Sequence, residues 1–177
     1  MQDPTSTPRI LIVEPHKGGL YVMARRLGEA GYRVVSCANA SDAVAELHRA
    51  PVGLLLAELR MAPMSGVDLT RLVRDDSSLK DTPVILITGR SDATGAVDGF
   101  SAGADDVVAK PVHFEVLLAR IAQRMAKARA VRELRQDNAT LDARVVTRAI
   151  ELGEMRAAFE ASEVERMRLA AMMRASD

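Results

Sequence analysis

Four polar residues each come directly after a short apolar run in this sequence. They are Glu14, Glu58, Thr88 and Lys110. Two of them carry carboxylates, one carries a hydroxyl and one carries an ammonium group. In open α/β sheets, ligands bind at the carboxyl ends of the strands. If the apolar runs are strands, we therefore expect the four side chains to lie along one edge of a sheet and to mark the site where ligand chemistry takes place.

The elements that must position these residues alternate along the chain. The apolar runs predicted as strands are Arg9–Val13, Arg33–Cys37, Gly53–Ala57, Val84–Ile87 and Val107–Ala109. Stretches with helical spacing follow each of them, and either Asn39 or Ser41 can cap the second helix. Five strand–helix alternations in ~120 residues predict an α/β fold, a doubly wound five-stranded parallel sheet with helices on both faces.

The composition excludes several classes of protein. The 24 basic and 24 acidic residues cancel, and only 3% of the residues are aromatic, which argues against a nucleic-acid partner. No apolar run approaches the ~20 residues that span a bilayer, so we expect no membrane partner. The single cysteine, Cys37, cannot form an internal disulfide, and we expect it in the core. These features indicate a cytoplasmic protein.

Other residues that could do chemistry lack the necessary spacing. His16, His48 and His113 are scattered, so we expect them to be surface or core residues and not metal ligands. Gly18-Gly19 lacks the rest of a phosphate-binding fingerprint.

Several stretches of the first 126 residues occur together in one known family. They are Ile-Leu-Ile-Val at 10–13, Gly31-Tyr32, Leu-Arg-Met at 59–61 with Gly66, Pro-Val-Ile-Leu-Ile-Thr-Gly at 83–89, Ala-Gly-Ala-Asp-Asp at 102–106, Lys110-Pro111 and Leu-Leu-Ala-Arg-Ile at 117–121. Arg9 to about Ala126 thereby resembles the receiver domain of two-component response regulators, the CheY-like family with a flavodoxin-like fold. The resemblance implies an aspartate at the end of the third strand that accepts a phosphoryl group from a histidine kinase. It also implies an acid pair that holds Mg²⁺, a Thr and a Lys that bind phosphoryl oxygens, and a cis peptide bond before Pro111.

The sequence departs from this pattern at the positions that carry the chemistry. The acceptor position holds Glu58, the acid pair is Glu14-Pro15, the aromatic switch position holds Val107, and the acidic position before Gly66 holds Ser65. Proline offers no side-chain ligand, which leaves Glu14 as a weak metal site. We therefore interpret the domain as a pseudo-receiver that is not an enzyme and needs no cofactor. The alternative is a phosphoaccepting, Mg²⁺-dependent receiver of a histidine-kinase phosphorelay.

Glu58 also invites a second prediction. Its extra methylene moves the carboxylate by roughly one carbon–carbon bond toward Lys110, which we expect on a neighbouring strand tip. We predict that the two side chains pair and imitate the charge that phosphorylation brings. The alternative is a Glu58 side chain in water and an inert site.

The chain from His113 onward contains no proline and has helical spacing. A heptad seam places Val131, Asn138, Val145, Leu152, Phe159, Arg166 and Met173 at a, and Leu134, Leu141, Arg148, Met155, Ser162 and Leu169 at d. Nine of these thirteen residues are apolar, and Asn138 at an a position favours two strands, so the seam predicts a coiled-coil homodimer. Ile150, Val164 and Met172 lie off the seam and leave a four-helix packing open. The basic residues between Arg120 and Arg135 are expected to form a solvated face.

These patterns predict three segments. Residues 1–8 form a flexible tail, 9–126 the receiver-like domain and 127–177 an extended helix that dimerises. We expect the partners to be a second copy of the chain and a signalling protein, either a histidine kinase or a downstream output protein.

Overall fold

The computed structural model describes residues 7–174, so most of the expected N-terminal tail lies outside the described residues. Five parallel strands form one sheet in the order β2-β1-β3-β4-β5, which is the flavodoxin-like order. Their bounds are β1 Arg9–Val13, β2 Arg33–Cys37, β3 Leu54–Glu58, β4 Val84–Thr88 and β5 Asp106–Ala109. The predicted doubly wound parallel sheet is confirmed.

Five helices connect and follow the strands. Their bounds are α1 Lys17–Glu29, α2 Ala40–Arg49, α3 Gly66–Asp75, α4 Ala93–Ser101 and α5 Phe114–Arg174. Of the two candidate caps for α2, Asn39 takes the role, because its side chain accepts a hydrogen bond from the amide of Asp42. In the part of the chain that the structure describes, no helix is long and apolar enough to cross a bilayer.

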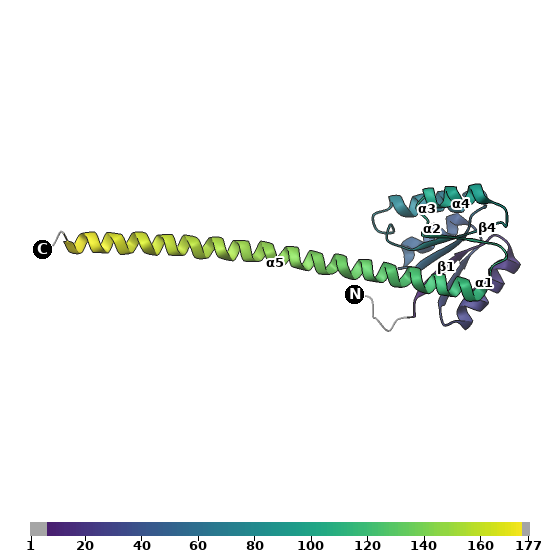
Figure 1. The fold of residues 1–177 in the computed structure, drawn as a ribbon, viewed down its shortest axis with the longest axis horizontal. Coiled ribbons are helices and arrows are strands. Elements are labelled where there is room, and N and C mark those ends of the chain that lie inside the picture. The colour runs from purple at the N-terminus through teal and green to yellow at the C-terminus, as the bar shows by residue number, and fades with distance from the viewer. Residues whose placement is uncertain (1–6, 175–177) are drawn as a thin grey trace. The chain divides into compact units, whose positions relative to one another are not determined.

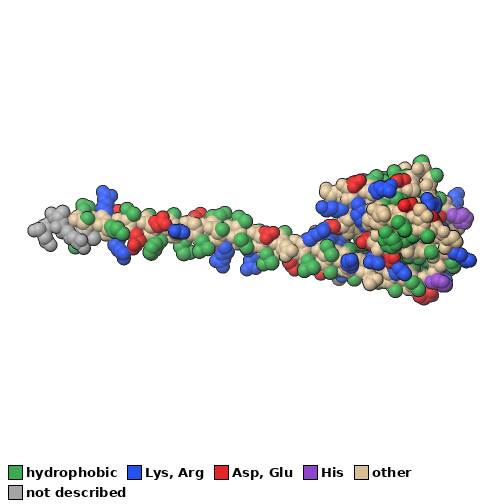
Figure 2. All heavy atoms as spheres, turned by 45° about the horizontal axis from the view of Figure 1, so that its top comes forward, with side chains coloured by type: hydrophobic (Ala, Val, Ile, Leu, Met, Phe, Trp, Pro, Cys, Tyr) green, Lys and Arg blue, Asp and Glu red, His purple; other side chains and the backbone are tan. Residues whose placement is uncertain are grey.

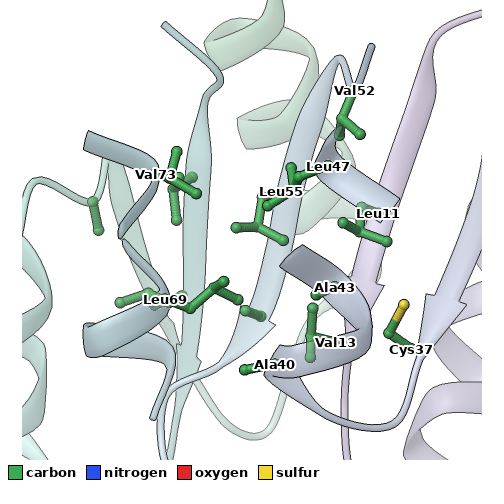
Figure 3. Close-up of a cluster of buried hydrophobic side chains, with 14 of the residues drawn as sticks. Leu11, Val13, Cys37, Ala40, Ala43, Leu47, Val52, Leu55, Leu69 and Val73 are labelled. Carbon is green, nitrogen blue, oxygen red and sulfur yellow. The ribbon is translucent and has the colours of Figure 1, made fainter. Parts of the chain in front are cut away.

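The helices cover both faces of the sheet (Figure 1). One hydrophobic cluster lies under α2 and α3 and includes Leu47, Leu55, Leu69 and Val73, several of which are drawn in Figure 3. A second cluster lies on the opposite face and is formed by the sheet, α1 and the first turns of α5. Near-continuous apolar strands are what a sheet buried on both faces requires.

Two features refine the sequence predictions. The peptide bond between Lys110 and Pro111 is cis, as the family resemblance implied, and the bond between Ala62 and Pro63 is cis as well. The expectation that Glu58 and Lys110 occupy neighbouring strand tips is wrong, because β4 lies between β3 and β5. The two residues therefore meet across the end of an intervening strand.

The helix α5 belongs to two compact units. The chain divides into residues 1–130 and residues 131–177, whereas we predicted the boundary between 126 and 127. Within the first unit, Leu117 and Ile121 of α5 are fully buried against the sheet, and Met125 packs on the same cluster.

Candidate functional site

The four predicted site residues lie at the carboxyl edge of the sheet. Glu58 and Thr88 are the last residues of β3 and β4, and Glu14 and Lys110 directly follow β1 and β5. The turn after β3 returns tightly, since a Cβ atom added at Gly66 would lie 2.4 Å from the carbonyl oxygen of Glu58. Only glycine allows α3 to begin this close to the strand.

Lys110 lies between the two carboxylates. Its Nζ atom is 2.6 Å from Oε2 of Glu58 and 3.2 Å from Oε2 of Glu14. The main chain fixes its position, because the amide of Lys110 donates to the carbonyl oxygen of Thr88 at 2.8 Å. The predicted contact between Glu58 and Lys110 is confirmed, and the sequence did not predict that Glu14 shares the same cation.

Both acidic side chains of the cluster are buried. Glu14 is 3% and Glu58 is 9% exposed. The second oxygen of Glu14, Oε1, accepts a hydrogen bond of 2.9 Å from the amide of His16. Among the described residues, Oε2 of Glu58 contacts Lys110 as an ion pair and has no further hydrogen-bond partner.

Burial dominates the electrostatics of this cluster. It raises the pKa of Glu58, and the nearby Lys110 ammonium offsets this effect only in part. Burial acts to lower the pKa of Lys110, but the carboxylates of Glu58 and Glu14 outweigh it and raise that pKa above its ordinary value. The lysine is therefore held in its charged form by two acids.

Thr88 lies on the same edge but bonds elsewhere. Its hydroxyl donates to Oδ2 of Asp92 at 3.2 Å, and Asp92 caps α4 by accepting from the amide of Gly95 at 2.8 Å. Arg60, two residues after Glu58, donates hydrogen bonds to both carboxylate oxygens of Asp92 at 2.7 and 2.8 Å. The paired Arg60 guanidinium, with the Gly95 amide, holds the pKa of Asp92 well below its usual range.

Sequence reasoning missed Arg60 and Asp92. The one available signal was the position of Asp92 directly before a helical stretch, which is typical of an N-cap. Their contact joins the loop after β3 to the start of α4, and nothing in the spacing of Arg60 and Asp92 predicts it.

The residues present do not fit a Mg²⁺ site of the family type. Pro15 offers no ligand, and both oxygens of Glu14 already contact donors from His16 and Lys110. Across residues 7–174, no group of three His, Cys, Asp or Glu side chains is placed to hold a metal ion. Mg²⁺ is bound in near-octahedral geometry by waters and one or two protein carboxylates, and Glu14 has no oxygen left without a donor contact.

The two other departures from the family pattern have clear local surroundings. Ser65 caps α3, because its hydroxyl accepts from the amide of Asp68 at 3.1 Å while Asp68 accepts from the amide of Ser65. Val107, at the position where the family carries its aromatic switch, is half-buried and packs against the cluster under α3.

Asp106 is a buried residue that sequence reasoning did not single out. It begins β5, is 4% exposed, and both of its oxygens lie 2.9 Å from Nη1 of Arg120. Arg124 adds a third contact at 3.3 Å. The prediction that all the basic residues from Arg120 onward are solvated is therefore wrong for these two arginines, which bind α5 to the sheet.

The heptad residues of α5 lie on its surface. In the described structure Leu134, Leu141, Val145, Leu152, Met155 and Phe159 are all exposed, as is Asn138, whereas Val131 is half-buried. Figure 2 shows such hydrophobic side chains along the length of the helix. A continuous helix with this much exposed apolar surface is typical of one that packs against another helix.

The remaining predicted residues have structural roles. His16 caps α1 through Nδ1, which accepts from the amide of Gly19 at 3.2 Å. Cys37 is buried, as expected. His48 lies 3.8 Å from Asp76 on the surface and contacts none of the four site residues in the described structure.

Comparison with known proteins identifies the family. Residues 10–122 match the model of the response regulator receiver domain. The response regulator PhoP of Pseudomonas aeruginosa is 34% identical over 113 residues, which are 64% of this chain and 49% of PhoP. The regulatory protein VanRB of Enterococcus faecalis is 31% identical over 156 residues, which are 86% of this chain and 70% of VanRB. A response regulator from Chloroflexus aurantiacus has a crystal structure with a TM-score of 0.67 and 26% identity, over 68% of this chain and 99% of that one.

These matches cover the sheet, the site and the start of α5, so the chain belongs to the response regulator receiver family of two-component signalling. The chain spans about half the length of the first curated relatives that it matches.

Proposed function

We propose that this receiver signals without accepting a phosphoryl group at Glu58, and that it acts through a dimer of α5 helices and contacts with another signalling protein. The observation that carries the proposal is Lys110, which lies between Glu58 and Glu14 at 2.6 and 3.2 Å. In phosphoryl transfer, such a cation neutralises charge on the transferring group. Here two carboxylates of the protein already take that charge.

The nucleophile and the metal site point the same way. Glu58 contacts Lys110 through Oε2, so an oxygen that would have to attack a phosphoryl group is already paired with a cation. Pro15 removes the second metal-binding acid, and Mg²⁺ normally carries part of the transition-state charge. The paired nucleophile and the missing metal-binding acid therefore both reduce the rate of phosphorylation.

The Glu58–Lys110 contact also supports a signalling state that needs no modification. It places an anion beside the lysine, where a phosphorylated receiver has its phosphoryl oxygens. Meanwhile the Thr88 hydroxyl bonds to Asp92 and leaves the carboxylate cluster to Lys110. The receiver thus has one charge arrangement built into its sequence, and its output depends on which proteins its surface and its α5 seam bind.

Incubation with acetyl phosphate and Mg²⁺, followed by intact-mass measurement and a Phos-tag gel, tests the proposal. We expect no adduct on the natural chain. The matched control carries Pro15→Asp and Glu58→Asp together, which restores both acids and should gain about 80 Da, one phosphoryl group. An adduct on the natural chain that maps to Glu58 would instead support the phosphoaccepting, Mg²⁺-dependent receiver.

A further inference from the structure

An apolar ridge attaches the first turns of α5 to the sheet. Leu117 and Ile121 are fully buried, and Met125 lies so close to Gly53 that a Cβ atom added there would be 2.8 Å from the methionine methyl group. The three α5 residues are four apart in sequence, so they share one side of the helix. The first compact unit ends at residue 130, and the ridge therefore belongs to it.

A buried charged cluster lies beside this ridge. Arg120 and Arg124 are also four residues apart, and both contact Asp106 at the start of β5, at 2.9 and 3.3 Å. Asp106 is their only ion-pair partner among the described residues, and the buried Nε atom of Arg124 has no hydrogen-bond partner there. We call these three residues the α5 latch. One carboxylate of the sheet thus holds two cations of the helix.

The charges make the docking of α5 sensitive to a single residue. The side chain of Asp106 is 6% exposed, so its charge is out of contact with most of the solvent. A buried ion pair adds little stability compared with an apolar contact of the same size, but removing one partner leaves the other charge buried and unpaired, which is strongly destabilising. Without the carboxylate, the two guanidinium groups are better placed in water than against the sheet.

The docked turns continue directly into the heptad seam, because α5 is one helix from Phe114 to Arg174. Starting a helix is far less favourable than extending one, with a nucleation constant of about 10⁻³. Turns that are held on the sheet remove this step for the segment that follows. A helix that is already ordered also loses less conformational entropy when it binds a second copy. The order of residues 114–130 should therefore affect the strength of a seam dimer.

We propose that Asp106 is a positioning residue for the α5 dimer. Through Arg120 and Arg124 it orders the base of the helix, residues 114–130, and loss of its charge weakens the dimer although no seam residue changes. This inference rests on the proposed function, which supplies the seam dimer. It adds a residue of the sheet that controls how strongly the dimer forms.

Asp106→Asn in the full chain tests the proposal with two measurements. We expect hydrogen exchange to increase in peptides from residues 114–130. We also expect the dissociation constant of the dimer, measured by sedimentation velocity over a dilution series, to rise roughly tenfold, about 1.4 kcal/mol. Arg124→Gln removes only the longer contact of the latch and should give a smaller increase in both measurements. This milder variant tests the proposal even if Asp106→Asn does not fold.

The matched control is Asn39→Ala. It removes the cap of α2, a helix whose cluster lies on the other face of the sheet from α5. It should lower the free energy of unfolding but leave the exchange of residues 114–130 and the dissociation constant as they are in the natural chain.

The opposite results overturn the inference in distinguishable ways. If exchange at residues 114–130 rises in both latch variants while the dissociation constant does not change, the latch is structural only, and the proposed function stands. A dissociation constant that rises without faster exchange, or that rises equally in Asn39→Ala, shows that the order of the helix base is not the cause. A natural chain that is monomeric at every concentration overturns this inference together with the proposed seam dimer.

Discussion

The Nζ atom of Lys110 lies 2.6 Å from Oε2 of Glu58, although β4 separates the strands that carry them. The longer side chain of a glutamate, compared with an aspartate, carries the carboxylate toward the lysine across the end of β4. The same ammonium group contacts Glu14 after β1 at 3.2 Å. One cation thus joins three strand ends at the site where the family performs phosphoryl transfer.

Removing the two partners separately and together should show that they are coupled. We expect a double-mutant cycle of Glu58→Gln and Lys110→Met, measured by urea unfolding, to give a coupling free energy of about 1 kcal/mol. The value is modest because Lys110 is partly exposed to water. The exposed pair Arg25 and Glu29, 3.5 Å apart on α1, is the control and should show almost none. A coupling free energy of zero between Glu58 and Lys110 would contradict the proposed charge arrangement.

The pH dependence of stability should reflect the burial of Glu58. Because its pKa is raised in the fold, the native state keeps this proton to higher pH than the unfolded chain does. As pH rises above the ordinary value of 4.5, the natural chain should therefore lose unfolding free energy relative to Glu58→Gln, until the raised pKa is passed. Urea titrations between pH 4 and pH 8 measure the difference.

Lys110 gives the opposite end of the same profile. Because the pKa of Lys110 is raised, its contribution to the free energy of unfolding is complete below the ordinary value of 10.5 and is lost as pH rises through the pKa of the folded state.

For the Glu58→Gln comparison, Glu29→Gln controls for the loss of an exposed carboxylate. A natural chain that gains stability relative to Glu58→Gln between pH 4.5 and pH 8 would mean that attraction to Lys110 outweighs burial.

Periodicity predicted the parts of this molecule that depend on local sequence. Short apolar runs predict the strands, and the polar residue after four of these runs predicts the site edge, which is why Glu14, Glu58, Thr88 and Lys110 were found. The cap of α2 remained open between two residues, because Asn39 and Ser41 can both accept a backbone hydrogen bond.

The contacts between distant segments could not be predicted in this way. Arg60 and Asp92 are 32 residues apart and meet only because α4 starts above the loop after β3. From the sequence alone, Asp106 is one of two acidic residues before the last strand. In the structure it begins β5 and forms buried ion pairs with Arg120 and Arg124 of α5. Neither charge nor spacing separates such a residue from a solvated one, since burial is a property of the assembled fold.

Arg60 and Asp92 should control the order of α4. We expect Arg60→Ala to increase hydrogen exchange of the first α4 amides, and Asp92→Ala to increase it more, roughly fivefold, because the cap is lost as well. Arg60→Lys should fall between the natural chain and Arg60→Ala, since lysine cannot grip both oxygens. Mass spectrometry of peptides that contain Gly95 measures the exchange.

A cap substitution elsewhere separates this effect from general loss of stability. Asn39→Ala removes the cap of α2 and should increase exchange in α2 without changing α4. If Arg60→Ala leaves the exchange of α4 unchanged, the bidentate contact between Arg60 and Asp92 does not order this helix. Asp92, the partner of Thr88, is then held in place by its N-cap hydrogen bond alone.

We expect that substitutions in the proximal part of the α5 heptad seam are enough to break the dimer. Leu134 and Leu141 are exposed at successive d positions near the start of the second compact unit. Replacing both with Gln removes apolar surface worth about 1.5 kcal/mol for each leucine that the dimer buries. A homodimer loses four leucines in this way, about 6 kcal/mol as an upper bound, so we expect the dissociation constant to rise by at least about 100-fold. Light scattering over a dilution series measures it.

Two further chains show where the interface lies. Ala139→Gln with Ala143→Gln alters b and f positions of the same turns and should leave the dimer intact. A chain that ends after Ala130, at the boundary of the first compact unit, lacks all but the start of the helix and should be a monomer. If that shortened chain remains a dimer, the receiver surface holds the two copies together. The exposed heptad residues of α5 would then serve a different partner helix.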